Sequence, residues 1–147
     1  MGPWLLFAHL IGAVVWLGGM TFMLAALRPA AIAELEPPAR PRLLLVVLAR
    51  FFPLVWASIA LLLGTGLVAL AAAAGTAPPG WNAMAGLGVL MGLVFGYIQF
   101  VPYAAARRGA RAGDWPAVAR ALQRLHPLVQ LNCTLGWLAV ALVVLWR

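Results

Sequence analysis

Hydrophobic residues are gathered into four long runs, and the segments between these runs hold nearly all of the charged residues. Each run reaches the roughly 20 residues that a helix needs to cross a ~30 Å hydrocarbon core. Backbone N–H and C=O groups cannot stay unpaired in lipid, so each run is expected to be helical. The pattern predicts a single domain over residues 1–147, with membrane helices over about residues 4–27, 51–74, 81–103 and 125–146.

The connections between the runs differ in charge. The first and third connections are rich in arginine, whereas the second, "AGTAPPG", is uncharged and typical of a tight turn. In the third connection, Asp114 suits a helix N-cap and Pro116 suits a first helical turn. These residues predict a short amphipathic helix over about residues 115–124 that leads into the fourth span.

The positions of the arginines predict the orientation in the membrane. Every arginine except Arg147 falls at the end of the bundle that holds the first and third connections. By the positive-inside rule this end is cytoplasmic, and both termini lie on the periplasmic, outer side. Trp4, Trp81 and Trp146 then all fall at the outer interface, where tryptophan collects. We therefore expect an all-α, four-helix transmembrane bundle.

Composition supports a membrane protein and excludes several other classes. Hydrophobic residues make up 65% of the chain and charged residues 9%, whereas a soluble domain is about half apolar and a quarter charged. The net charge of +7 does not indicate a nucleic-acid partner, because the arginines form no basic recognition helix with interleaved aromatic residues. Cys133 is the only cysteine, so no disulfide can form within the chain.

Catalytic motifs are missing from the sequence. All three acidic residues, Glu34, Glu36 and Asp114, fall in the predicted connections, so no carboxylate within a span is available to relay protons. The sequence has no CxxC, no HExxH and no phosphate-binding glycine loop. This argues against an enzyme, although it does not decide the question.

One face of the first predicted helix carries residue types that bind soft metals. At 100° per residue, a stripe about 100° wide contains His9, Gly12, Trp16, Gly19, Met20 and Met23. The stripe can be an ordinary packing face, with Gly12 and Gly19 at helix contacts. It can also be a copper or haem face, because imidazole and thioether groups are ligands for these metals. His9 and Met20 lie about 16 Å apart along the helix axis, so they cannot bind one ion together and could only bind it one after the other.

The third and fourth helices add further candidates. Gly88, Gly92 and Gly96 recur every fourth residue and predict a seam for tight helix packing. Tyr97 lies near the cytoplasmic end and needs a partner, which can be protein, water or a cofactor. In the fourth helix, Asn132 is expected to hydrogen-bond across helices. His126 lies at the cytoplasmic boundary, where it is either an interfacial histidine or a metal ligand.

The two histidines fall at opposite ends of the predicted bundle. They therefore cannot both ligate one haem within one chain. A haem with two histidine ligands would require a homodimer that pairs equivalent histidines across its axis.

Several segments resemble the small stand-alone CopD-type (copper resistance D domain) membrane proteins of bacteria. They are "HLIGAVVWLGGMTF", "LRPAA", "ARFFPLVWASIALLLGTG", "VPYAAARRGARAGDWPAVARAL" and "LVQLNCTLGW", and they run in order over nearly the whole chain. The resemblance implies a multi-pass inner-membrane protein linked to copper uptake or tolerance. By this resemblance, His9, Arg50 and Asn132 match residues of the family. The sequence differs from the family at Tyr97, where such proteins often have histidine, and at His126-Pro127, where they often have two arginines.

A more distant likeness is to the HemJ-type protoporphyrinogen oxidases, which share the four-helix plan and bind haem. The segment "WNAMAGL" lacks the histidine and lysine of their third helix. Three hypotheses follow: copper handling, a haem b protein or redox enzyme, and a cofactor-free scaffold that binds a second copy or another membrane protein. The candidate cofactor-binding residues are His9, Tyr97 and Arg50, and the candidate metal ligands are His9, Met20, Met23 and His126.

Overall fold

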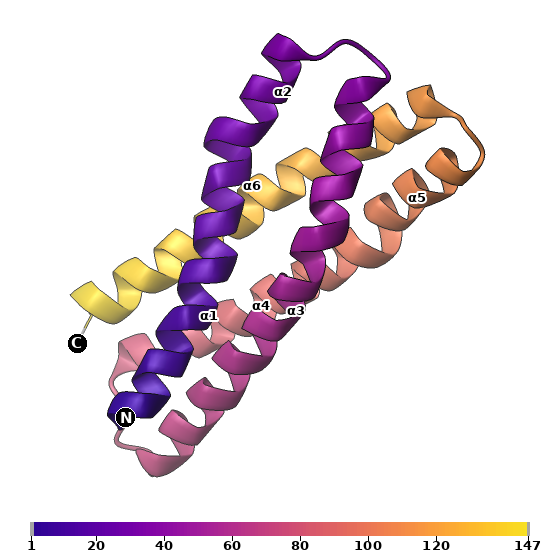
Figure 1. Cartoon of the computed structure of the whole chain (residues 1–147). Helices are drawn as coiled ribbons and strands as arrows, with labels where there is room; N and C mark the ends of the chain where they lie inside the picture. Colours follow the sequence, from indigo (N-terminus) through magenta and orange to yellow (C-terminus); the bar gives the residue numbers. More distant parts are fainter. Residues whose placement is uncertain (1, 147) are drawn as a thin grey trace.

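The computed structural model describes residues 2–146, and all of its regular secondary structure over this range is helical. The elements are α1 (Pro3–Phe22), η1 (Met23–Leu27), α2 (Arg28–Glu34), α3 (Ala39–Ala72), α4 (Pro79–Ile98), η2 (Gln99–Tyr103), α5 (Ala104–Arg111) and α6 (Trp115–Leu145). Because α1, η1 and α2 are continuous, as are α4, η2 and α5, the chain forms four long helical segments (Figure 1). The predicted all-α, four-helix fold is confirmed.

The four segments span Pro3–Glu34, Ala39–Ala72, Pro79–Arg111 and Trp115–Leu145, and each is long and apolar enough to cross a membrane. They extend beyond the predicted spans at the ends that carry the arginines. The sequence interpretation placed Arg28–Arg42 in a connection, but only residues 35–38 lie between helices there. The predicted amphipathic helix at residues 115–124 is the first part of α6. Arg147, which was expected at the outer end, lies outside the described residues.

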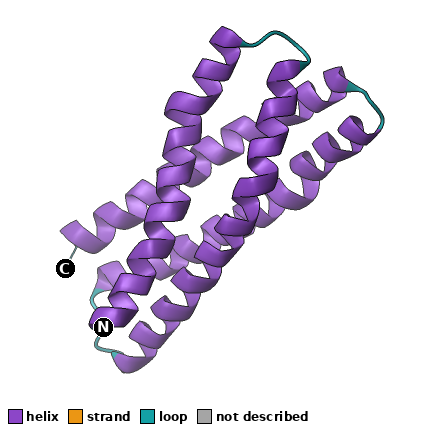
Figure 2. Ribbon diagram, in the orientation of Figure 1, coloured by secondary structure: helices purple, strands orange, loops and turns teal. Residues whose placement is uncertain are grey.

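Local sequence explains where the helices begin and end. The Asp114 carboxylate accepts a hydrogen bond from the Ala117 N–H at 2.9 Å and so caps α6 as predicted. Gly113, just before this cap, has φ +71°, a conformation that glycine adopts without strain. Short loops separate the segments, so consecutive segments run antiparallel (Figure 2).

Two wide helical turns interrupt the first and third segments. In η1 the Arg28 N–H bonds the Met23 carbonyl, five residues back, and Pro29 follows immediately. In η2 the ring of Pro102 lies inside the turn. Proline lacks an N–H and its ring clashes with the carbonyl four residues earlier, so a π-turn beside it relieves that clash.

The two halves of the chain repeat the same plan. α1, η1 and α2 have 20, 5 and 7 residues, and α4, η2 and α5 have 20, 5 and 8. The second half starts each long segment 76 residues after the first, from Pro3 to Pro79 and from Ala39 to Trp115. The bundle is therefore built from two helical hairpins, α1 to α3 and α4 to α6, that repeat the same order of elements. The sequence alone did not reveal this repeat.

The hairpins pack so that α1 contacts α3 and α6, and α4 contacts α3 and α6. Both termini lie at the same end as the α3–α4 turn, opposite the turns that follow α2 and α5 (Figure 1). Many large apolar side chains are exposed, including Trp4, Phe100 and Leu145. Such a surface is unusual on a soluble protein, and here it faces lipid.

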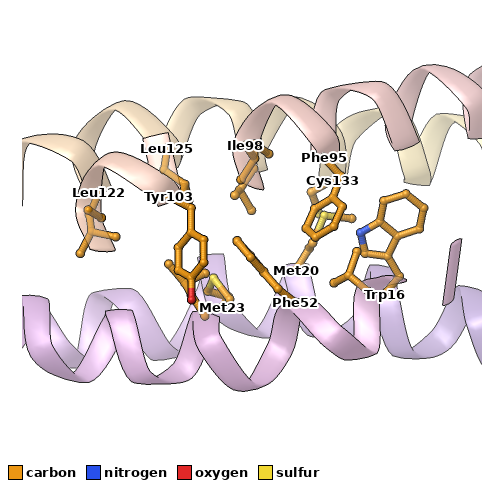
Figure 3. Close-up of a cluster of buried hydrophobic side chains, with 14 of the residues drawn as sticks. Trp16, Met20, Met23, Phe52, Phe95, Ile98, Tyr103, Leu122, Leu125 and Cys133 are labelled. Atoms are coloured by element: carbon orange, nitrogen blue, oxygen red, sulfur yellow. The ribbon is translucent and has the colours of Figure 1, made fainter. Parts of the chain in front are cut away.

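The core between the hairpins is aromatic and sulfur-rich (Figure 3). The Phe52 ring packs edge-on against Phe95, with centroids 5.0 Å apart, and against Tyr103 at 4.6 Å. Trp16 packs edge-on against Phe95 at 6.3 Å. Edge-to-face pairs place the positive ring edge on the negative ring face, so they fix this layer of the core.

Close helix contacts use some of the predicted glycines and not others. A Cβ on Gly12 would lie 3.1 Å from the Ser58 carbonyl oxygen, and a Cβ on Gly19 would overlap the Phe51 ring. In contrast, a Cβ on Gly88, Gly92 or Gly96 would meet no atom within 4 Å. The predicted seam on the third helix therefore does not pack against another helix of this chain.

Candidate functional site

His9 bridges α1 and α3 near the end of the bundle that holds the termini. Its Nδ1 lies 2.7 Å from the Thr65 Oγ1, and the Thr65 hydroxyl donates its single proton to the Leu61 carbonyl. When the hydroxyl donates to this carbonyl, its oxygen accepts from the imidazole, and the hydrogen of the neutral ring lies on Nδ1. In this tautomer the Nε2 atom keeps its lone pair, the form in which imidazole binds a metal.

Asn132 occupies the centre of the bundle without a protein hydrogen-bond partner. Its side chain is 1% exposed, and both amide atoms, Nδ2 and Oδ1, are unpaired. The predicted hydrogen bond across helices is therefore absent from the described residues. An orphaned buried amide costs about 1–3 kcal/mol for each group left unpaired, so its place in the core needs an explanation.

A small cavity of about 10 Å³ lies beside Asn132, and two of the predicted metal ligands, Met20 and Met23, line it. Aromatic rings, including those of Trp16 and Phe52, complete the wall. The volume is that of one water molecule or one ion, and a porphyrin does not fit there. We refer to this cavity, with Met20, Met23 and Asn132, as the methionine–asparagine cavity.

Cys133 lies next to Asn132, but its thiol is already engaged. The Thr21 hydroxyl donates to the Leu17 carbonyl at 2.8 Å, so its oxygen is free to accept from the Cys133 Sγ at 3.6 Å. The Trp137 indole N–H also donates to the Thr21 oxygen, at 3.3 Å. These contacts join α1 to α6 and make Cys133 a packed side chain of the core.

A second, larger cavity of about 380 Å³ lies at the arginine-bearing end, between η1, α2 and the first turns of α3 and α6. We call it the basic pocket. Most of its lining is apolar, and the polar side chains are Arg28, Arg40, Gln123 and His126. The pocket shares Met23, Leu48 and Val129 with the methionine–asparagine cavity, so the two cavities meet at these side chains.

The structure separates the other predicted site residues. His9 bonds Thr65 on α3 near the end that holds the termini, whereas His126 lines the basic pocket at the arginine-bearing end. The two histidines therefore lie toward opposite ends of the bundle, as predicted. Tyr97 is 55% exposed and Arg50 is exposed, and neither lines either cavity. Over residues 2–146 no three His, Cys, Asp or Glu side chains are close enough to hold a metal ion.

Sequence reasoning missed Thr65 and the basic pocket. Thr65 is 56 residues from His9, and a threonine in an apolar run carries no signal of its partner. The basic pocket draws on four elements, η1, α2, α3 and α6, and two of these parts, α2 and the first turn of α3, had been assigned to a connection.

These features define a class: a multi-pass α-helical membrane protein with a few buried polar side chains in its core. Comparison with known proteins adds no family to this description. No family model, no curated protein and no solved structure matches the chain.

Proposed function

We propose that this chain is a copper-handling protein of the bacterial inner membrane, of the CopD type, and that Cu(I) is its cargo. Thioether sulfur is a soft ligand that suits Cu(I). Met20 and Met23 are almost completely buried and line one cavity of ionic size. The single observation that carries the proposal is that the unpaired amide of Asn132 borders the same cavity.

The two methionines and the amide would supply a mixed sulfur and oxygen ligand set in an otherwise apolar environment. No carboxylate or thiolate balances the charge there, so the site would bind a monovalent ion more readily than a divalent one. Weak, neutral ligands suit a site through which an ion must pass, because binding must allow release.

Candidate metal ligands also lie toward both ends of the bundle, on either side of this cavity. His9 would present its Nε2 as a ligand at the end that holds the termini, with Nδ1 bonded to Thr65. Met23 borders both cavities, and His126 lines the basic pocket beyond it. The proposed route therefore runs from His9 past Met20 and Met23 to His126.

The test is an anaerobic Cu(I) titration of the purified protein in mild detergent, in competition with a colorimetric Cu(I) chelator. We expect one Cu(I) per chain and a loss of at least about tenfold in affinity in the double variant Met20→Leu/Met23→Leu. Leucine keeps most of the volume of methionine, and such exchanges usually cost less than about 1.5 kcal/mol of stability.

Met91→Leu is the matched control, because Met91 is also buried in the core but does not line the methionine–asparagine cavity. We expect it to bind Cu(I) like the original chain. The proposal fails if the original chain binds no Cu(I), or if Met91→Leu loses as much affinity as the double variant.

A further inference from the structure

The basic pocket contains positive charge that no side chain of the pocket neutralises. Arg28 and Arg40 both line it, and none of the three carboxylates of the chain does. Two guanidinium groups that no carboxylate balances favour an anion in a partly buried cavity. The pocket therefore has the electrostatic character of an anion site.

Arg40 is held in place by the end of α2. Its Nε donates to the Leu35 carbonyl at 3.1 Å, and its Nη2 donates to the Ile32 carbonyl at 2.9 Å. A guanidinium has five N–H groups, so at least three remain free for a ligand. Because these contacts already fix the side chain, binding an anion would cost little additional conformational entropy.

A cation–π contact supports the opposite wall. The Arg42 guanidinium lies 4.5 Å from the centre of the Trp115 ring, and Trp115 lines the pocket. This contact ties the first turn of α3 to the first turn of α6. The pocket is therefore braced on this side by Arg42, an arginine that does not line it and that the ligand need not touch.

The remaining wall is apolar and suits a hydrocarbon chain. Leu24, Leu44 and Val47 are half-buried and line the cavity, together with the buried Leu48 and Leu122. Its volume of about 380 Å³ falls in the range of small-molecule sites, which start at about 300 Å³. A small inorganic anion would leave most of this apolar surface uncovered.

The position of the pocket along the bundle also indicates which class of ligand it can bind. α3 has 34 residues, which is about 51 Å of helix, whereas the hydrocarbon core is ~30 Å thick. The pocket uses the first turns of α3 and α6, at the end where the arginines gather. These turns extend past the hydrocarbon core to the depth of the lipid headgroups.

We infer that the basic pocket binds an anionic phospholipid of the surrounding bilayer. The phosphate would lie between Arg28 and Arg40, with Gln123 and His126 as further hydrogen-bonding groups, and one acyl chain would cover the apolar wall. A zwitterionic lipid is disfavoured because no carboxylate lines the pocket to receive its ammonium group. The inference does not rest on copper binding, because Arg28, Arg40 and Gln123, which would hold the phosphate, lie outside the methionine–asparagine cavity.

The experiment is native mass spectrometry of the purified chain, titrated separately with dioleoyl phosphatidylglycerol and dioleoyl phosphatidylcholine, which have the same acyl chains. We expect one high-affinity phosphatidylglycerol per chain. Arg28→Gln should weaken it by about tenfold, because a hydrogen bond to a charged group contributes about 1.5–3 kcal/mol. Leu44→Trp should weaken it similarly by filling the pocket without a change of charge.

Arg111→Gln is the matched control, because Arg111 is exposed at the same end and lies outside the pocket. Unchanged lipid affinity in this variant supports the inference. A loss equal to that of Arg28→Gln would overturn it, because general attraction to the basic end would then explain binding. Melting curves in detergent identify a variant that fails to fold, and Leu44→Trp then tests the pocket without touching an arginine.

Other occupants give distinguishable results. Displacement of the lipid by inorganic phosphate alone would overturn the inference in favour of a free anion site. Equal binding of phosphatidylcholine would overturn the role of the arginines. A Soret band in the purified protein that disappears in His126→Ala would assign the pocket to haem and would also overturn it.

Discussion

Replacing Asn132 by leucine tests the interpretation of the core most directly. Leucine has the same number and branching of side-chain heavy atoms as asparagine, but it carries no polar atoms. Asn132 is 1% exposed and both of its amide atoms are unpaired. In the copper-free protein, the exchange should therefore remove the desolvation cost of two orphaned groups.

The expected gain is smaller than the sum of two such costs. Each orphaned group costs about 1–3 kcal/mol, but leucine is slightly larger, and overpacking a core costs about 1–3 kcal/mol. The cavity of about 10 Å³ beside the residue absorbs part of the added volume. We expect a net stabilisation of about 1–2 kcal/mol, or a rise of about 2–8 °C in Tm.

The assay is thermal unfolding in detergent, followed by tryptophan fluorescence, with a chelator or with Cu(I) present. Copper should raise the Tm of the original chain, because a ligand at 100 times its Kd stabilises by about 2.7 kcal/mol. It should not raise the Tm of Asn132→Leu. Asn82→Leu is the control, since Asn82 is the only other asparagine and is exposed. A Tm of copper-free Asn132→Leu below that of the control would refute the reasoning, because the amide would then be stabilising the fold through bound water.

Two further predictions concern single helix contacts. His9→Ala removes the hydrogen bond between the imidazole and Thr65, so chemical unfolding should show a loss of about 1 kcal/mol. Cells that express the folded variant should accumulate less copper, and unchanged accumulation would contradict the role of His9 in the proposed route. Gly12→Ala should destabilise by about 1 kcal/mol, since its Cβ would lie 3.1 Å from both Leu62 and a backbone carbonyl oxygen. Gly92→Ala has open space around it and should stabilise by up to about 1 kcal/mol through helix propensity, so equal effects of the two glycine variants would contradict the packing described here.

The four membrane helices were predictable because the constraint that produces them acts on composition alone. A long apolar run must be helical in lipid, whatever its partners are. The helix ends were less predictable, because the helices continue through charged residues such as Arg28, Arg40 and Arg42. Beyond the hydrocarbon core, packing and capping decide where a helix ends, and these depend on residues far away in the sequence.

The candidate site was predicted in its residue types and not in its arrangement. A helical stripe placed Met20 and Met23 on the inner face, and both are buried. The same stripe could not show that Asn132 borders their cavity, because this depends on how α6 packs against α1. The glycine repeat at Gly88, Gly92 and Gly96 was predicted to pack against another helix and does not. Glycine spacing marks a smooth helix face, but it does not show which surface, if any, packs there.

The wide turn η1 has a consequence for how this chain can vary. An α-helix advances about 100° per residue, so one residue added to or removed from a turn rotates everything beyond it by that angle. Met23 and Arg28 lie at the two boundaries of η1. Deleting one residue between them would shorten the five-residue turn to the four-residue turn of an α-helix, so Arg28 would stay one turn above Met23 and would still face the basic pocket. The wide turn therefore lets this segment lose one residue without the rotation that the same deletion would cause elsewhere in the helix.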